Sequence, residues 1–351
     1  MRTIVALRLG LAVAALWAST PMASAAVPLG PAGLPAPSAE FTNVFLTWDG
    51  RTETLVIDPS IRAESEQLAV IIPTPGPAIT TPVGTGFFAE LADLTAPEVV
   101  VERHWFTTAE PPPAQQFIGV LGGMSPPGPP HTSGPLAAVD AWLAARDIAV
   151  DATTRETLEQ YGRDGWSFTA VQLGAVQSGG MTFENPDGYV STEPFLLRFD
   201  TDRLIYPMRA DRGAPGPMTT KMYALADHRL ARGDTDAHQH NVDIEFAGRL
   251  APTQRALLDE PIQRGHDYLT VLTTTVPAPS TITTDATFVR AASDEPFRQT
   301  VTRVENVELF GVPRGWVFVA VGFAGVVAIG VAVFRRRGLG SSTDCGGPGS
   351  P

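Results

Sequence analysis

A run of nineteen uncharged, mostly apolar residues, 316–334, is the feature that most constrains this chain, and three arginines, 335–337, follow it directly. At about 1.5 Å per residue, a helix of this length reaches roughly 28 Å, close to the hydrocarbon thickness of a bilayer. A buried core helix would usually show a polar face over this many turns. The pattern therefore predicts a transmembrane helix over 316–334 and a cytoplasmic tail over 335–351.

The N-terminus predicts export by an independent signal. Two arginines within the first eight residues precede a nine-residue apolar run, and a small-x-small motif ends at Ala25. This layout is typical of a secretory signal peptide over 1–25, and an uncleaved anchor is the alternative. Both ends then agree on one localisation: the cell membrane, single-pass, with the N-terminal domain outside. The residues before 316 hold no L-P-x-T-G-type sorting motif, so we expect the anchor to be retained.

Charge and cysteine usage limit the classes of function. The whole chain carries a net charge of −12, although both of its ends are basic, so the region between them is more acidic still. Such a surface does not favour nucleic acid as a partner. The single cysteine, Cys345, falls in the predicted tail. The predicted ectodomain therefore has no disulfide, thiol nucleophile or cysteine metal site.

The order of local patterns predicts an α+β ectodomain over 41–310, preceded by a Pro/Ala/Gly leader over 26–40. Asp49-Gly50 is a type I′ turn pair between two strand-like runs, which predicts a hairpin with Trp48 opposite Arg51. The proline-rich stretch 109–135 is a possible internal boundary or surface loop. Strands and helices show no regular alternation, so the predicted class is a mixed, largely antiparallel β-rich domain with a few short helices.

Three more local predictions follow from the residues. The apolar run 68–73 predicts a buried strand. Thr153 and Glu156 form a capping box that opens a helix ending near Gly162. The segment from Phe195 to about Asp227 predicts a β-meander, with further strands beyond it.

The ordered segments "FLTWDGRTETLVI", "AVIIPTPGPA", "AVDAWLAARDIAV", "YGRDGWSFTAVQL" and "PFLLRFDTDRLIYPMRA" resemble the bacterial domain-of-unknown-function family 2330. The likeness covers roughly residues 40–310. It implies the architecture of a signal peptide, one domain and a C-terminal membrane span, and it implies no activity or catalytic residue. Family members often carry cysteines just after the signal peptide, and this chain has none there.

The sharpest candidate for chemistry is "DHRLARGDTDAHQHNVDIE". His238 and His240 would face the same side of a strand, with Asp236 near them, which is a fragment of a divalent-metal site. The alternative is a polar loop between two strands. The motif "GTGFFA" at 84–89 fits the loose dinucleotide fingerprint, but no strand directly precedes it, so it predicts a helix start.

Two functions remain open at this point. One is a binding or display module of the cell envelope, with a protein or glycan partner and no cofactor. The other is an extracytoplasmic hydrolase or metal-dependent enzyme that uses the cluster over 234–243. Self-association through the membrane span is a further prediction, because four small residues recur there every fourth position: Ala320, Ala324, Ala328 and Ala332.

Overall fold

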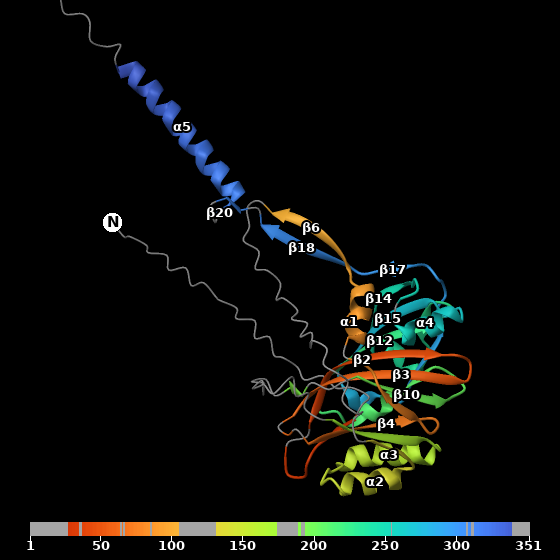
Figure 1. The fold of residues 1–351 in the computed structure, drawn as a ribbon. Helices are drawn as coiled ribbons and strands as arrows, with labels where there is room; N and C mark the ends of the chain where they lie inside the picture. Colours follow the sequence, from red (N-terminus) through yellow and green to blue (C-terminus); the bar gives the residue numbers. More distant parts are fainter. Residues whose placement is uncertain are drawn as a thin grey trace, which may run out of the picture. The chain divides into compact units, whose positions relative to one another are not determined.

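The computed structural model describes residues 27–34, 37–63, 65, 67–84, 86–104, 131–173, 189–190, 194–253, 255–306, 308–309 and 312–338 (Figure 1). Contacts divide the chain into two compact units. The larger comprises Met1–Ala96 with Gly119–Arg298, and the smaller comprises Pro97–Ile118 with Gln299–Pro351. The predicted signal peptide and most of the proline-rich stretch 109–135 lie outside the described residues, so both stay predictions.

A nine-stranded sheet forms the centre of the larger unit, in the order β17-β14-β15-β12-β2-β3-β10-β5, with β9 paired to β3. β12 and β2 run parallel, and the other pairs are antiparallel. The fold is therefore mixed and β-rich with several short helices. The strands are β2 (Ser38–Trp48), β3 (Thr52–Arg62), β5 (Ile79–Pro82), β9 (Tyr189–Val190), β10 (Phe195–Asp200), β12 (Met218–Ala226), β14 (Asn241–Arg249), β15 (Tyr268–Val276) and β17 (Phe297–Arg298).

A second, four-stranded antiparallel sheet has the order β1-β4-β8-β7. It consists of β1 (Val27–Leu29), β4 (Leu68–Thr74), β8 (Ser167–Leu173) and β7 (His131–Gly134). Every residue of β4 is buried, which confirms the buried strand predicted from its apolar run. β1 lies within the predicted leader, and the side chains of Val27 and Leu29 are buried against the core. The packed structure thus starts earlier than residue 41.

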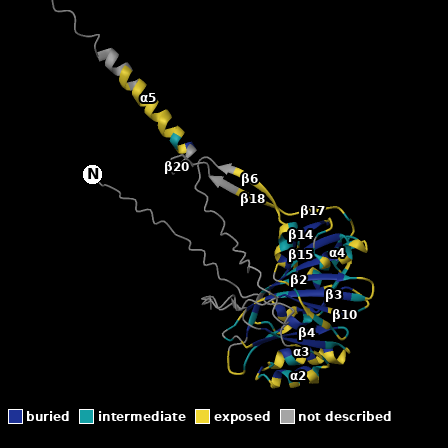
Figure 2. Ribbon diagram, in the orientation of Figure 1, coloured by how far each residue is buried: buried dark blue, intermediate teal, exposed yellow. Residues whose placement is uncertain are grey.

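Three apolar clusters arrange these elements in four layers. Helices α1 (Phe87–Leu94) and α4 (Ala256–Gln263) pack on one face of the nine-stranded sheet, and its other face packs on the four-stranded sheet. Helices α2 (Leu136–Ala144) and α3 (Ala152–Arg163) cover the outer face of that second sheet (Figures 1 and 2). Side-chain alternation along each strand makes this possible, because Leu55 and Ile57 face the second sheet whereas Val56 faces α1.

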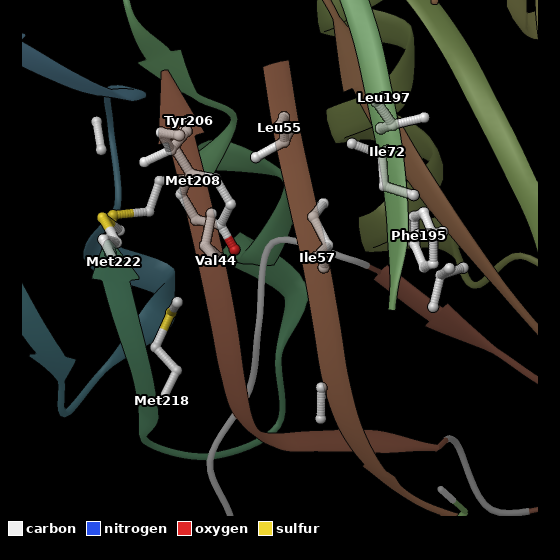
Figure 3. Close-up of a cluster of buried hydrophobic side chains, with 14 of the residues drawn as sticks. Val44, Leu55, Ile57, Ile72, Phe195, Leu197, Tyr206, Met208, Met218 and Met222 are labelled. Atoms are coloured by element: carbon white, nitrogen blue, oxygen red, sulfur yellow. The ribbon is translucent and has the colours of Figure 1, made fainter. Parts of the chain in front are cut away.

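The core between the two sheets also receives residues from short elements. Tyr206 and Met208 are fully buried there beside Val44 and Met222 (Figure 3). The short elements are a three-stranded sheet of β11 (Ile205–Tyr206), β16 (Ala286–Arg290) and β13 (Leu230–Arg232), and the 3₁₀ helices η1 (Met208–Gly213), η2 (Thr235–His238) and η3 (Pro279–Thr281).

The predicted hairpin is confirmed, but its turn has a different register. Gly50 has a φ of 97°, and β2 pairs with β3 in antiparallel fashion, with Trp48 opposite Glu53. The predicted contact of Trp48 with Arg51 is therefore wrong. The indole N–H of Trp48 donates to Thr201 O at 3.2 Å instead, and Arg51 pairs with a carboxylate of β10.

The predicted β-meander is also wrong. β10 pairs with β3 and β5, whereas β12 pairs with β2 and β15, so β2 and β3 separate them in the sheet. The segment between them folds as β11 and η1. The prediction assumed that strands adjacent in sequence pair with each other, but in this sheet β10 and β12 pair with strands far from them in the chain.

The helix predicted from the capping box starts slightly earlier than expected. Asp151 is the N-cap of α3, and its carboxylate accepts the backbone N–H of Thr154 at 3.0 Å. Thr153 lies inside the first turn. Both residue types cap helices well, and the sequence pattern selected the wrong one.

The smaller unit contains a parallel ribbon, a short hairpin and one helix. β6 (Glu98–His104) pairs with β18 (Thr300–Asn306), and β19 (Glu308–Leu309) pairs with β20 (Val312–Pro313). Helix α5 (Arg314–Gly338) covers the predicted membrane span, and most of its described apolar side chains are exposed.

No helix among the described residues is both long enough and apolar enough to cross a membrane. The transmembrane helix predicted over 316–334 is therefore not shown by the structure.

Candidate functional site

A polar pocket of about 240 Å³ lies in the larger unit, at one end of the sheet face that carries α1 and α4. Its floor is a row across three neighbouring strands: Thr47 of β2 opposes Thr54 of β3, which opposes Arg198 of β10. Each of these three lies two residues from a core residue of the same face, so strand alternation directs them to the same side. The sheet therefore provides a rigid base for the pocket.

Side chains of opposite charge alternate along the pocket wall. Arg198 Nη2 lies 3.5 Å from Glu260 Oε2, and Arg264 Nη2 lies 2.5 Å from Glu260 Oε1. Arg264 Nη1 lies 3.6 Å from Asp49 Oδ2. Helix α4 positions Glu260, and the turn after α4 positions Arg264. The four groups form one chain of ion pairs with no net charge.

The hairpin turn holds Asp49 in place at the pocket edge. Its Oδ1 accepts the backbone N–H groups of Thr52 at 2.7 Å and Arg51 at 3.0 Å. The N–H of Thr52 has the largest effect on the pKa of Asp49, and desolvation opposes it. The Arg51 N–H, Arg264 and His266 add to the lowering, so the pKa lies below its usual value. Asp49 is therefore an ionised acceptor at neutral pH.

Three threonines line the pocket, and the Thr52 hydroxyl donates to Asp200 Oδ1 at 2.9 Å. Within the described part of the chain, neither the Thr47 nor the Thr54 hydroxyl has a hydrogen-bond partner, and these two residues are 6% and 9% exposed. His266 also lines the pocket, and Leu257 and Pro261 of α4 supply an apolar wall. A hydroxyl can donate and accept, a carboxylate accepts, and a guanidinium donates. The pocket thus offers both kinds of hydrogen-bonding group within a small volume.

The metal-site residues predicted from the sequence lie elsewhere in the larger unit. Asp236 and His238 belong to η2, and β14 begins only at Asn241, so the two histidines do not share a strand. The Asp236 carboxylate accepts the N–H groups of Thr283 and Thr284, at 2.7 and 2.8 Å, and also the Thr283 hydroxyl. Desolvation raises the pKa of Asp236, but these hydrogen bonds outweigh it and lower the pKa overall.

Asp234 of the same cluster is engaged as well. It forms a buried ion pair with Arg232, with oxygen–nitrogen distances of 2.6 Å. Among the residues that the structure describes, no three His, Cys, Asp or Glu side chains are grouped as metal ligands would be. The carboxylates of this cluster hold loops together, and its metal binding stays a prediction.

His240 is buried, with 7% of its surface exposed, and neither ring nitrogen has a partner in the described structure. Desolvation is the main cause that lowers its pKa, and the nearby Arg232 lowers it further. A buried imidazole in this setting is neutral at pH 7.

A second buried group of charges joins α3 to η1. Asp285 accepts the Tyr161 hydroxyl and two N–H groups of Arg209, the backbone at 3.0 Å and Nε at 2.9 Å. Burial raises the pKa of Asp285, and its hydrogen bonds and Arg209 partly offset this. Asp211 is buried nearby, and burial followed by the charge of Asp285 raises its pKa well above the usual value. This group of charges stabilises the packing of α3 against η1.

Sequence reasoning missed the polar pocket. Its residues come from β2, the hairpin turn, β3, β10, α4 and the turn before β15, and they share no spacing pattern. The Asp49-Gly50 pair predicts only a turn. One signal was available: Thr47 and Thr54 are polar at positions where the strand alternation predicts apolar residues of a covered face.

Comparison with known proteins adds family membership. Residues 37–126 and 131–289 match the family described as "uncharacterized protein conserved in bacteria (DUF2330)". No curated protein matches the chain. Among solved structures, the crystal structure of baculovirus P35 is similar at 11% sequence identity and a TM-score of 0.35, covering 75% of this chain and 99% of that one. A similarity of that size carries no argument about this chain. The family match spans most of the chain, and the protein therefore belongs to the bacterial family DUF2330.

Proposed function

We propose that this protein is an extracytoplasmic binding module whose ligand site is the polar pocket at the end of β2, β3 and β10. The observation that carries this proposal is the combination of Thr47 and Thr54, whose hydroxyls have no hydrogen-bond partner among the described residues, with a chain of alternating charges beside the sheet. A concave site with a few convergent polar groups is the usual form of a small-ligand site. The proposal develops the binding-module interpretation of the sequence.

The lining chemistry favours binding over bond cleavage. The described lining residues include no serine or cysteine, and the carboxylates of Asp49 and Glu260 each lie against an arginine. An activated nucleophile would have an adjacent base, and neither the Thr47 nor the Thr54 hydroxyl is hydrogen-bonded to one among the described residues. Ion pairs and hydroxyls instead suit recognition of a polar ligand by hydrogen bonds.

We also propose that the module is held at the outer face of a membrane through residues 316–334. The export signal, the apolar run and the arginines after it support this. The described side chains of α5 include large exposed apolar groups, such as Phe323 (71% exposed) and Val321 (66% exposed). Exposed apolar surface of this kind marks contact with a membrane or another protein.

The pocket is tested with the full-length protein in detergent and a panel of small polar ligands: neutral sugars, amino acids, dicarboxylic acids and polyamines. We expect at least one class to raise the unfolding temperature of the wild type and not that of Arg264→Gln. Arg203→Gln is the matched control, because Arg203 is an equally exposed, ion-paired arginine outside the pocket. No stabilisation by any class, or equal stabilisation of Arg264→Gln, contradicts the proposal.

The membrane location is tested separately by fractionation. We expect the protein to stay with the membrane after alkaline and high-salt washes, and we expect protease added outside intact cells to remove the larger unit. Recovery in the soluble fraction, or cleavage just before residue 316, contradicts it.

A further inference from the structure

We infer that the ligand of the polar pocket is a neutral carbohydrate, a single sugar ring or the terminal ring of a glycan. This inference rests on the proposed function, since it names the ligand class of the same pocket. Charge, hydrogen-bonding capacity and size each restrict that class.

The charges of the pocket restrict the class of ligand first. Arg198 and Arg264 are balanced by Glu260 and Asp49, and each arginine lies against at least one of these carboxylates. The charges of the wall already cancel within these half-exposed pairs, so a charged ligand would bring a charge that the wall does not balance. The chain as a whole is acidic, with a net charge of −12, and this also disfavours anions. A ligand without net charge is therefore preferred.

The hydrogen-bonding groups restrict the class further. The carboxylates of Asp49 and Glu260 only accept, the guanidinium of Arg198 only donates, and the hydroxyls of Thr47 and Thr54 do both. Donors and acceptors alternate along the wall, where the nitrogen–oxygen distances between neighbouring charged side chains are 2.5–3.6 Å. Adjacent hydroxyls on a sugar ring match such a lining, because each hydroxyl can donate to a carboxylate and accept from a guanidinium.

Size and wall chemistry agree with a single ring. The volume of about 240 Å³ lies below the ~300–1,000 Å³ typical of sites for drug-sized ligands. Leu257 and Pro261 provide an apolar wall on one side. The C–H face of a sugar ring can cover this wall while its hydroxyls reach the threonines and the charged chain. The strand floor fixes the positions of Thr47 and Thr54 relative to each other.

The test measures ligand-observed NMR binding to the full-length protein in detergent. The neutral probes are methyl glycosides of glucose, galactose, mannose and N-acetylglucosamine. The charged comparators are glucuronate, glucosamine, serine and glutamate. Two pocket variants, Thr54→Val and Glu260→Gln, are compared with Thr81→Val, because Thr81 is an exposed threonine of β5 outside the pocket.

We expect at least one neutral glycoside to bind, with affinity reduced about 3–10-fold by Thr54→Val and unchanged by Thr81→Val, as loss of one hydrogen bond predicts. Binding of a charged comparator that depends on Thr54, without glycoside binding, overturns the carbohydrate inference and leaves the proposed function standing. Glycoside binding that neither pocket variant changes overturns the inference as well. Failure of every probe and of the broader ligand panel overturns both proposals.

Discussion

Glu53 provides the most direct test of the electrostatics of the core. Its side chain is fully buried in β3, where Oε2 accepts the backbone N–H of Ile205 at 3.0 Å and Oε1 has no partner in the described structure. Desolvation raises the pKa of Glu53 well above its ordinary value, and the hydrogen bond from Ile205 offsets only part of this. Because the folded state holds the proton more tightly than the unfolded state, stability is greatest below the unfolded pKa. It falls as pH rises towards the folded pKa.

The substitution Glu53→Gln removes this pH dependence at nearly constant shape. A glutamine amide resembles the protonated carboxyl, so the variant and the wild type should be about equally stable near pH 4. Above the unfolded pKa, the free energy of unfolding of the wild type should fall relative to the variant by about 1.4 kcal/mol per pH unit, until the folded pKa is reached. The variant should therefore be the more stable protein at neutral pH, with a difference that grows as pH rises from 4.

The assay is urea unfolding of the wild type and Glu53→Gln from pH 4 to pH 8. Glu156→Gln is the control, because Glu156 is exposed on α3 and its substitution should stay within about 0.5 kcal/mol at every pH. A constant difference between Glu53→Gln and the wild type across this range would refute the reasoning. So would a wild type that is the more stable protein at pH 7.

Three further perturbations test other parts of the account. Asp151→Ala should destabilise the protein by about 1 kcal/mol because it removes the N-cap of α3, whereas Thr153→Ala should destabilise it less. Thermal unfolding measures both variants, and a larger loss of stability in Thr153→Ala would contradict the assigned cap. Gly50→Ala should cost about 1–2 kcal/mol because φ at this turn is 97°, and the control Gly84→Ala, whose added Cβ meets no atom within 4 Å, should be near neutral in urea unfolding. The pKa of His240 is lowered in the folded state, so the unfolded state binds the proton more tightly and stability should be lost as pH falls below about 6.5. Between pH 7 and pH 5, the urea midpoint of His240→Gln should therefore fall less than that of the wild type. Parallel pH curves of the two proteins would contradict this.

Some features of this fold could be predicted from the sequence because they depend on interactions between residues adjacent in the chain. The Asp49-Gly50 pair requires a turn, and Gly50 indeed has a positive φ. The apolar run of β4 indicated a strand that is buried along its whole length. These signals depend on a few adjacent residues, and tertiary packing did not change them.

Pairing partners could not be predicted in the same way. β12 lies in parallel beside β2, and β10 lies beside β3 and β5. Nothing in the residues of β10 or β12 specifies these neighbours, because a buried strand offers the same backbone hydrogen bonds to any partner. The division of the core into layers follows from these pairings, so it could not be predicted either.

The candidate site was missed for a related reason. Thr54 and Arg198 meet only because β3 and β10 pair, and Glu260 reaches them only because α4 packs on that face. The histidine cluster, in contrast, was visible because its residues are close in sequence. In the structure the Asp236 carboxylate accepts backbone N–H groups of the loop before β16, and metal binding by this cluster stays a prediction.

The most direct test of the central claim is methyl NMR of the full-length protein labelled at threonine, titrated with the neutral glycosides. Thr47 and Thr54 line the pocket, whereas Thr81 lies on the edge strand outside it. The account predicts saturable shifts of the Thr47 and Thr54 methyl signals with one glycoside, while the Thr81 signal stays fixed. Saturable binding that leaves Thr47 and Thr54 unmoved, or no binding at all, would contradict the claim that this pocket is the ligand site.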